Sequence, residues 1–247
     1  MGNKLKCLQI RNETDKHADV YIHGDVIDDT WKGWLSDSDG KTMAGYVLPT
    51  DVKAQLDALA GKDLTIYVNS DGGLVPAGIA IANMIARHDG HTVGIIDGWA
   101  ASIASVIFMA CDELRMPSNT FLMVHKPSAG VLGSAPDMRR VADALDTIQA
   151  GIEKTHQECS REGVTADAIH ADVEAETWYT AEQAAEKYQI TVIEPQAQMV
   201  AYSKGIDFKH MPDAVRDMKT APDEPKNELA RKKAYILEAL AKGGLVE

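Results

Sequence analysis

The sequence predicts an α/β protein built around a mainly parallel sheet, and three observations support this prediction. From residue 18 onward, short apolar runs alternate with helical stretches, which is the pattern of stacked β-α units. The 247 residues are enough for one α/β domain of ordinary size with an appendage. The composition, 45% hydrophobic and 25% charged, is typical of a globular protein with a core rather than of a disordered chain.

The first half of the chain contains three apolar runs that predict strands and three longer stretches that predict helices. Residues 28–46, rich in Asp, Ser and Gly, predict a long loop or insertion, after which Thr50 is expected to cap a helix. The stretch 74–88 is apolar almost all round, so we expect a helix that is buried on most sides. The predicted strands are 18–26, 64–70 and 91–98, and the predicted helices are 51–60, 74–88 and 99–111.

The second half contains one long amphipathic stretch, residues 134–159, with Ser134 as the expected N-cap and Pro136 in the first turn. A helix of about 25 residues is ~37 Å long at 1.5 Å per residue, so we expect it to project toward a neighbouring subunit. Its apolar stripe consists of Met138, Val141, Leu145, Ile148 and Ile152. The remaining predicted strands are 113–118, 120–125 and 190–194, and the remaining predicted helices are 165–173 and 180–189.

The chain changes character after residue 194. A proline-containing segment around Pro222 and Pro225 predicts a linker, and residues 227–244 predict a final amphipathic helix ended by two glycines. We therefore divide the sequence into a domain at 1–194 and a C-terminal extension at 195–247.

Charge and cysteine content exclude several classes of function. A net charge of −12 without Lys or Arg clusters argues against a nucleic-acid partner. The N-terminus has no apolar signal region, and no run of 18 apolar residues occurs, so we expect a cytoplasmic protein with no membrane partner. Cys7, Cys111 and Cys159 lie far apart, which favours reduced thiols and predicts neither a disulfide nor a metal site.

Three short segments contain the residues of a serine nucleophile site. A serine becomes reactive where a base lies within hydrogen-bond reach and donors face the developing oxyanion. Ser102 is predicted near the start of a helix, where unpaired N–H groups favour negative charge. The pair Gly72–Gly73 follows a strand, and glycine allows backbone N–H groups to approach a substrate there. His125 ends another apolar strand.

Each of these features also has a plainer interpretation. Paired glycines form tight turns, and Ser102 and Ser105 are small residues of the kind that close helix packing requires. A single histidine at a strand end is more often structural. The acidic partner is open among Asp172, Glu174 and Glu176, which all precede a helix that Thr180 is expected to cap. The other seven histidines lie in polar stretches or on predicted helix surfaces: His17, His23, His88, His91, His156, His170 and His210.

Taken in order, the segments resemble a known family. "YVNSDGG", "GWAASIAS", "FLMVHKP" and "ETWYTAEQAAEKYQI" are similar to the N-S-P-G-G, G-x-A-A-S, M-I-H-x-P and R-D-x-x-[LM]-[ST]-x-x-E-A segments of ClpP, the proteolytic subunit of the Clp protease. The "ETW" variant more closely resembles the ClpP-related head maturation (prohead) proteases of tailed phages. The resemblance covers residues 18–194 and implies a ClpP/crotonase-like fold of repeated β-β-α units with a C-terminal linker and helix.

The resemblance assigns roles to the candidate residues. Ser102 corresponds to the nucleophile and His125 to the general base, and the N–H groups of Gly73 and Ile103 correspond to the oxyanion hole. Ser102 follows Gly73 by 29 residues (102 minus 73), the separation expected in the family. The same comparison places the substrate near Gly72, Pro127 and Gly130.

Two positions depart from the family pattern. The family's aspartate lies four residues before the helix-opening Ser or Thr, which is Glu176 here (180 minus 4). A glutamate serves the same role in Ser-His-Glu hydrolases, although its longer side chain leaves Asp172 open as an alternative. "SDGG" replaces the usual "SPGG" and puts Asp71 beside the substrate-binding loop, a change that the sequence alone does not explain.

The resemblance implies an ATP-independent serine endopeptidase without a cofactor or metal. It predicts a ring-shaped homo-oligomer with helix 134–160 at the subunit interface, and protein substrates that are scaffold and capsid proteins of a phage prohead in the cytoplasm of a bacterial host. Three alternatives stay open: a housekeeping ClpP subunit that works with an ATPase, a crotonase-type acyl-CoA enzyme, and an inactive capsid-assembly protein. The final helix is expected to be an interaction segment, a tether or a surface helix.

Overall fold

The computed structural model describes residues 8–35 and 45–195, and its centre is an eight-stranded, mainly parallel sheet. Five strands run parallel in the order β2-β5-β6-β7-β10, and β1 pairs with β2 in the antiparallel direction. The predicted parallel α/β architecture is therefore confirmed. These strands are β1 (Leu8–Arg11), β2 (His17–His23), β5 (Asp63–Ser70), β6 (Thr92–Ala101), β7 (Glu113–Pro117) and β10 (Ile190–Ile193).

A second branch of the sheet starts from β6. The first half of β6 pairs with β7, whereas its last three residues pair with β8 (Phe121–Val124), which in turn pairs with β9 (Thr177–Thr180) in the antiparallel direction. The sequence pattern does not predict β9, because its four residues lie in the short segment between two helices. A separate two-stranded sheet joins β3 (Asp25–Val26) to β4 (Tyr46–Val47).

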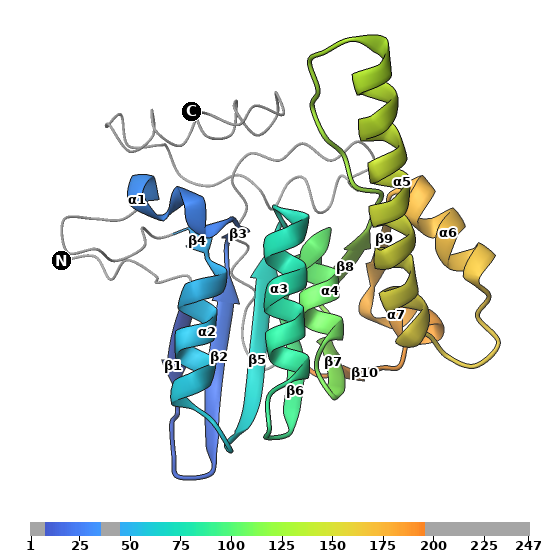
Figure 1. Ribbon diagram of the computed structural model, residues 1–247. Helices are drawn as coiled ribbons and strands as arrows, with labels where there is room; N and C mark the ends of the chain where they lie inside the picture. Colours follow the sequence, from blue (N-terminus) through green and yellow to red (C-terminus); the bar gives the residue numbers. More distant parts are fainter. Residues whose placement is uncertain (1–7, 36–44, 196–247) are drawn as a thin grey trace, which may run out of the picture.

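Three helices cover one face of the sheet: α2 (Pro49–Ala58), α3 (Val75–Ala86) and α4 (Ile103–Met109), as Figure 1 shows. Strand β5 shows why this face of the sheet is covered. Leu64, Ile66 and Val68 occupy every second position of the strand, and their side chains are fully buried. Full burial of such a side chain contributes about 1.5–3 kcal/mol. α3 is less enclosed than predicted: Ile79 and Asn83, one helical turn apart, are exposed.

Two predicted boundaries were wrong. Helix α2 starts at Pro49 with Leu48 as its N-cap, so Thr50 lies inside the first turn and donates its hydroxyl to Asp29 at 2.5 Å. Proline suits the first helical position because it needs no N–H partner there. Residues 99–101 belong to β6 rather than to the following helix, since they pair with β8. Local composition did not reveal that pairing.

The predicted insertion at 28–46 contains the short helices η1 (Asp29–Trp31) and α1 (Lys32–Leu35), and the first described range ends at residue 35. The expected linker and final helix of the C-terminal extension lie outside the described residues. Of the three cysteines, Cys111 and Cys159 are free thiols, and Cys7 is outside the described residues.

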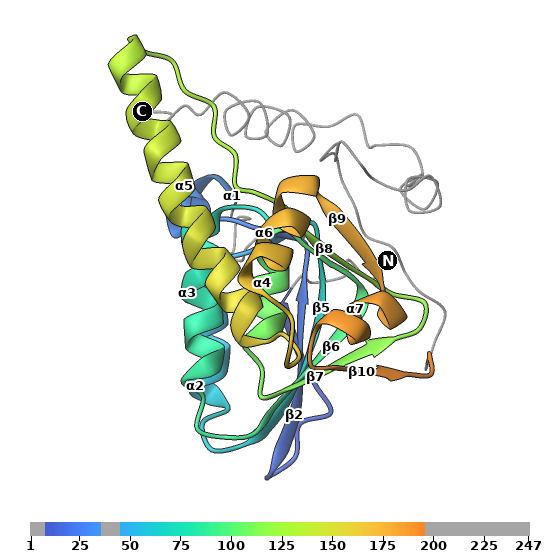
Figure 2. The ribbon, with the colours of Figure 1, turned by 90° about the vertical axis from the view of Figure 1, so that its right-hand side faces the viewer.

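The long helix α5 (Ala135–Glu158) projects from the rest of the domain, as Figures 1 and 2 show. Its start is confirmed at Ser134, which forms a reciprocal capping box with Asp137. The apolar stripe divides along the helix: Ile152 is buried in the core, whereas Met138 near the projecting end is 46% exposed. α6 (Ala166–Ala175) and α7 (Ala181–Lys187) complete this side.

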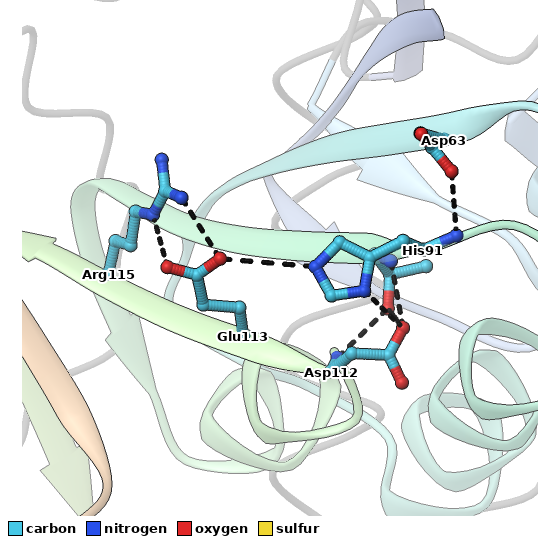
Figure 3. A network of polar contacts seen from close by, with 6 residues as sticks. Asp63, His91, Asp112, Glu113 and Arg115 are labelled. Carbon is cyan, nitrogen blue, oxygen red and sulfur yellow. Dashed lines mark hydrogen bonds and ion pairs between the residues drawn. The ribbon is translucent and has the colours of Figure 1, made fainter. Parts of the chain in front are cut away.

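A polar network joins the N-terminal ends of the central strands (Figure 3). The Asp112 carboxylate accepts from the N–H of Thr92 at 2.8 Å, and Glu113 accepts twice from the Arg115 guanidinium, at 2.8 and 2.9 Å. His91 lies between Asp112 and Glu113. Ligand sites of open α/β sheets usually lie at the carboxyl ends of the strands, and this network lies at the opposite end. Within the described ranges, no helix is both long and apolar enough to cross a membrane.

Candidate active site

Strand register brings the ends of β6, β8 and β9 together. Ala101 pairs with Met123, so Ser102 lies just beyond the end of β6, and its N–H donates to the Met123 carbonyl at 3.0 Å. Val124, the last residue of β8, pairs with Thr177, so His125, just after β8, lies beside Glu176, just before β9. Three residues far apart in the sequence therefore meet at one edge of the sheet.

Ser102 has an unusual backbone conformation, with φ 57° and ψ −130°. A non-glycine residue in such a region costs about 1–3 kcal/mol and persists only where the surrounding structure holds it. Glu176 also has a positive φ, 54°, and only Asn12 shares this sign among the other non-glycine residues described. Two of these three strained residues thus belong to the proposed site, and strain of this kind is common at functional sites.

His125 contacts the serine directly. Its Nε2 lies 2.8 Å from the Ser102 Oγ, within the range of a hydrogen bond. Burial lowers the pKa of His125 below its usual 6.5, and the nearby Glu176 carboxylate opposes this by favouring the charged ring. The ring is consequently neutral at pH 7 and can accept a proton, which is what a general base requires.

The three acids left open by the sequence have different surroundings. The Asp172 carboxylate accepts from the Tyr179 hydroxyl at 2.6 Å and forms an ion pair with Lys187. Glu174 is paired with Lys126 at 2.8 Å. The β8–β9 register places Glu176 beside His125, and its carboxylate raises the pKa of the ring, so Glu176 rather than Asp172 is the acid next to the candidate base.

Gly72 packs against the serine, and Gly73 packs against Val26. A Cβ atom on Gly72 would lie 2.7 Å from the Ser102 Cβ and 3.1 Å from the Ile103 nitrogen, and the backbone has φ +95°. A Cβ on Gly73 would lie 2.0 Å from the Val26 carbonyl oxygen. Only glycine fits at either position, so the pair is more than an isolated tight turn.

Backbone contacts orient the same loop. The Val26 N–H donates to the Gly72 carbonyl at 2.7 Å, and the Leu74 N–H donates to the Val26 carbonyl at 2.8 Å, so the loop is bridged to the chain after β2. Ile103 is the first residue of α4, and its N–H therefore has no partner within that helix. An amide without a partner in its own helix can donate to an oxyanion. This is the role proposed for the N–H groups of Gly73 and Ile103.

The segment after His125 has no regular secondary structure as far as α5. It contains Pro127 and Gly130, both partly buried, and ends in an exposed region where Leu132 is 97% accessible. The Lys126–Glu174 ion pair holds its first residues against α6. Pro127 and Gly130 therefore follow the base directly, and their contact with substrate stays a prediction.

Ser105 and His156 form a buried pair that the sequence did not reveal. The Ser105 hydroxyl donates to the Ser102 carbonyl at 2.6 Å and lies 3.0 Å from the His156 Nε2. His156 is one of the seven histidines that the sequence places in polar stretches or on helix surfaces, but its side chain is buried, at 1% exposure. The missed signal was its position four residues after Ile152, which continues the buried stripe of α5.

The arrangement provides the parts needed for acyl transfer: a hydroxyl, a neutral base, an acid near the base, and backbone donors beside the hydroxyl. Across the described residues, no cluster of three or more His, Cys, Asp or Glu side chains could hold a metal ion.

Comparisons with known proteins identify the family to which the chain is similar. A family model described as "Clp protease" matches residues 48–193. The chain is 32% identical over 192 residues to "ATP-dependent Clp protease proteolytic subunit 3" of Rhizobium etli, covering 74% of this chain and 88% of the relative. It is 33% identical over 152 residues to the subunit of the same name from Streptomyces coelicolor, covering 59% and 69%.

The fold agrees as well. The chain resembles the solved structure of a ClpP1 mutant from Listeria monocytogenes with a TM-score of 0.55 and 23% identity, over 72% of this chain and 92% of that one. The family model matches more than half of the 247 residues and includes the segments that contain Ser102 and His125. The chain therefore belongs to the Clp protease family and is a serine-type peptidase, a hydrolase.

Proposed function

We propose that the chain is a serine endopeptidase in which Ser102 is the nucleophile, His125 the general base and Glu176 the acid. The observation that carries the proposal is the 2.8 Å distance between the Ser102 Oγ and the His125 Nε2. The same contact argues against a crotonase-type acyl-CoA enzyme, because it supplies an activated nucleophile that enolate chemistry does not need.

The proposed reaction has two halves. As the Ser102 Oγ attacks the peptide carbonyl carbon, its proton passes to the His125 Nε2 and the carbonyl oxygen gains negative charge, facing the N–H groups of Gly73 and Ile103. His125 then gives the proton to the leaving amine as the C–N bond breaks, which leaves an acyl-enzyme. Water, deprotonated by His125, then attacks the ester carbon. As the bond from this carbon to the Ser102 Oγ breaks, His125 returns the proton to Oγ and the carboxylic acid product leaves.

Glu176 acts through His125. A carboxylate beside the imidazole stabilises the imidazolium that forms during each half-reaction and holds the ring in its productive orientation. The opposing effects of burial and Glu176 on the pKa of His125 support this role. Glu176 is the C-cap of α6 and has a left-handed backbone conformation. The chain reverses direction at this residue, which places the glutamate, one methylene longer than an aspartate, beside β8.

We further propose that the substrates are scaffold and capsid proteins of a phage prohead, cleaved without ATP in the cytoplasm of a bacterial host. The support is the "ETW" sequence at Glu176–Trp178 and the C-terminal extension at 195–247 beyond the peptidase domain at 1–194. We also propose that the peptidase domain is built of crotonase-like β-β-α units.

The active assembly is proposed to be a homo-oligomeric ring with α5 at the subunit interface. The support is the projection of α5 and the apolar side chains exposed near its start: Val131, Leu132 and Met138. An isolated domain gains nothing from a projecting apolar end, whereas a second copy of the chain would bury it.

A second candidate is a housekeeping subunit that works with an ATPase, which the names of the relatives favour. Incubation of the purified full chain with capsid and scaffold proteins separates the candidates. Cleavage without ATP supports the prohead protease, whereas cleavage that requires an added Clp ATPase and ATP supports the housekeeping subunit. An inactive assembly protein would cleave these proteins neither with nor without the ATPase and ATP.

The catalytic proposal is tested by labelling the full chain with a fluorophosphonate probe and mapping the adduct by mass spectrometry. We expect an adduct on Ser102 that Ser102→Ala abolishes and that His125→Ala slows by about 10²–10⁴-fold. Ser118→Ala, at an exposed serine at the end of β7, should label at the wild-type rate. A folded oligomer that carries no adduct, or carries it on another serine, would contradict the proposal.

A further inference from the structure

Asp71 is a buried carboxylate with an identified partner. Its Oδ1 accepts a hydrogen bond from the indole Nε1–H of Trp99 at 2.7 Å, and both residues are almost inaccessible, at 2% and 0% exposure. Asp71 directly precedes Gly72–Gly73, and Trp99 lies three residues before Ser102. The bond thus connects the loop of the proposed oxyanion hole to the strand that carries the proposed nucleophile.

An irregularity between β5 and β6 brings Trp99 to this position. Val68 pairs with Ile96 and Ser70 with Ala100, so Asn69 alone opposes residues 97–99. The Asn69 Oδ1 accepts from the backbone N–H of Trp99 at 3.3 Å. Residues 69 and 71, on both sides of Ser70, therefore hold the backbone and the side chain of the same tryptophan.

Gly98 makes this bulge possible. A Cβ atom on Gly98 would lie 2.5 Å from the Asn69 Oδ1, so any other residue would displace the amide that accepts from Trp99. Bulges of this kind re-aim a side chain next to active sites. Here the side chain that is re-aimed is the Trp99 indole.

Trp99 also contacts the strand that follows the proposed acid. Its ring lies edge to face with that of Trp178, with 6.4 Å between the ring centroids and 88° between the planes. Trp178 is on β9, two residues after Glu176. Trp99 packs in the same small cluster as Met123, two residues before His125. One side chain therefore touches elements that carry every part of the proposed site.

We infer that Asp71 and Trp99 are positioning residues, which hold the loop Gly72–Gly73 at a set distance from Ser102. The inference rests on the proposed function, since it concerns how that site is aligned. It also accounts for "SDGG": a proline in place of Asp71 would restrict its own φ, but it could not accept the indole proton. In this chain a side-chain hydrogen bond orients the loop instead.

The consequence is kinetic. Oxyanion donors act on the charge that develops in the transition state, so a displaced loop lowers kcat more than it raises KM. Complete removal of one donor costs roughly 10²–10³ in rate. We expect Asp71→Ala, which displaces rather than removes the donor, to lower kcat about 10- to 100-fold and to change KM by less than about threefold.

Three single variants, one double variant and one control variant of the full chain test the inference. Asp71→Asn keeps an Oδ1 acceptor and is expected to retain kcat within about threefold of wild type, whereas Asp71→Ala loses it. Trp99→Phe removes the donor but keeps an aromatic ring, and the double variant with Asp71→Ala should lose no more than the larger single loss. Trp34→Phe, at a tryptophan that is 58% exposed, is the matched control.

Fluorophosphonate labelling of Ser102 is the second readout, because the probe also needs the oxyanion donors. If the wild-type chain labels on Ser102 but Asp71→Ala labels at the same rate, the positioning role is overturned and the proposed nucleophile stands. If the wild-type chain does not label, the proposed function itself fails. If Asp71→Ala does not fold, Asp71→Asn and Trp99→Phe are compared instead. Equal losses of kcat and labelling rate in these two variants would overturn the inference. A loss in Trp99→Phe alone would support it.

Discussion

The Ser105 Oγ lies 3.0 Å from the Nε2 of the buried His156, beneath the first turn of α4. Ser105 has one hydroxyl proton, and it goes to the Ser102 carbonyl at 2.6 Å, which can only accept. His156 must therefore carry its proton on Nε2 and donate it to Ser105. This leaves the buried Nδ1 as an acceptor without a hydrogen-bond partner among the described residues.

This relationship predicts how stability depends on pH. Burial lowers the pKa of His156 from 6.5 to about 4, so between these values the unfolded chain binds a proton that the folded chain excludes. Above pH 6.5, His156 is neutral in both states and costs the folded chain no stability. As the pH falls from 6.5 toward 4, the free energy of unfolding decreases by at most about 3 kcal/mol. Urea unfolding of wild type and His156→Gln at pH 7 and pH 5 measures this loss.

The control for that experiment is His170→Gln. Its ring is exposed, and the hydrogen bond to Glu153 raises rather than lowers the pKa of His170. The acid-induced loss of stability should therefore persist in His170→Gln and be smaller in His156→Gln. Equal pH dependence in all three proteins would show that His156 does not titrate as its burial requires.

The identity of the acid can be decided with two amide substitutions. Glu176→Gln removes the carboxylate that favours the charged His125 ring, so we expect a loss of about 10²–10⁴ in kcat. The acidic limb of the kcat/KM profile should also move to lower pH, because only burial then acts on the pKa of His125. Asp172→Asn keeps an acceptor for the Tyr179 hydroxyl and should stay within about threefold of wild type. A larger loss in Asp172→Asn than in Glu176→Gln would exchange the two roles.

The packing of the oxyanion loop is tested with Gly72→Ala, for which Gly61→Ala is the matched control. Both have positive φ, but a Cβ on Gly72 would meet Ser102 and the Ala101 carbonyl at 2.7 Å, whereas nothing lies within 4 Å of one on Gly61. Gly61→Ala should cost about 1 kcal/mol of stability from backbone strain and leave activity unchanged. Gly72→Ala should abolish labelling of Ser102 while the chain stays folded by circular dichroism. An active Gly72→Ala enzyme would contradict the packing described above.

The proposed interface on α5 is tested by adding charge to its exposed apolar end. Met138→Glu is expected to shift the sedimentation profile toward smaller species, since a buried unpaired carboxylate opposes association. Thr147→Glu is the control, because nine residues at about 100° each place it on the opposite side of the helix. An unchanged assembly in Met138→Glu, or equal dissociation in both variants, would exclude the stripe as the contact surface.

Much of the fold was predictable because its signals are local. Alternation of apolar runs and helical stretches predicted the parallel strands β5 and β6, and Ser134 and Thr180 were recognised as helix caps from their side chains and neighbours. The strand β9 was missed because its four residues follow acidic helix residues and pair only with β8. The β5–β6 irregularity was missed for the same reason: register is a property of two strands, not of one.

Burial likewise separated two histidines that look alike in sequence. His156 and His170 both lie in polar helical segments, yet His156 is enclosed beneath α4 and His170 is exposed beside Glu153. Periodicity could have placed His156 on the buried stripe, but it could not identify Ser105 as its partner. That partner comes from α4, an element 51 residues earlier in the chain.

By itself the sequence determined the order of the catalytic segments, the family resemblance, and the residue types at each position, since these depend only on the chain. The tertiary structure decided which of those residues meet. Pairing of β6 with β8 and of β8 with β9 aligned Ser102, His125 and Glu176 at one edge, and the bulge opposite Asn69 turned Trp99 toward Asp71. The physical reason is that hydrogen-bond register and burial are set between segments distant in sequence, where no local pattern records them.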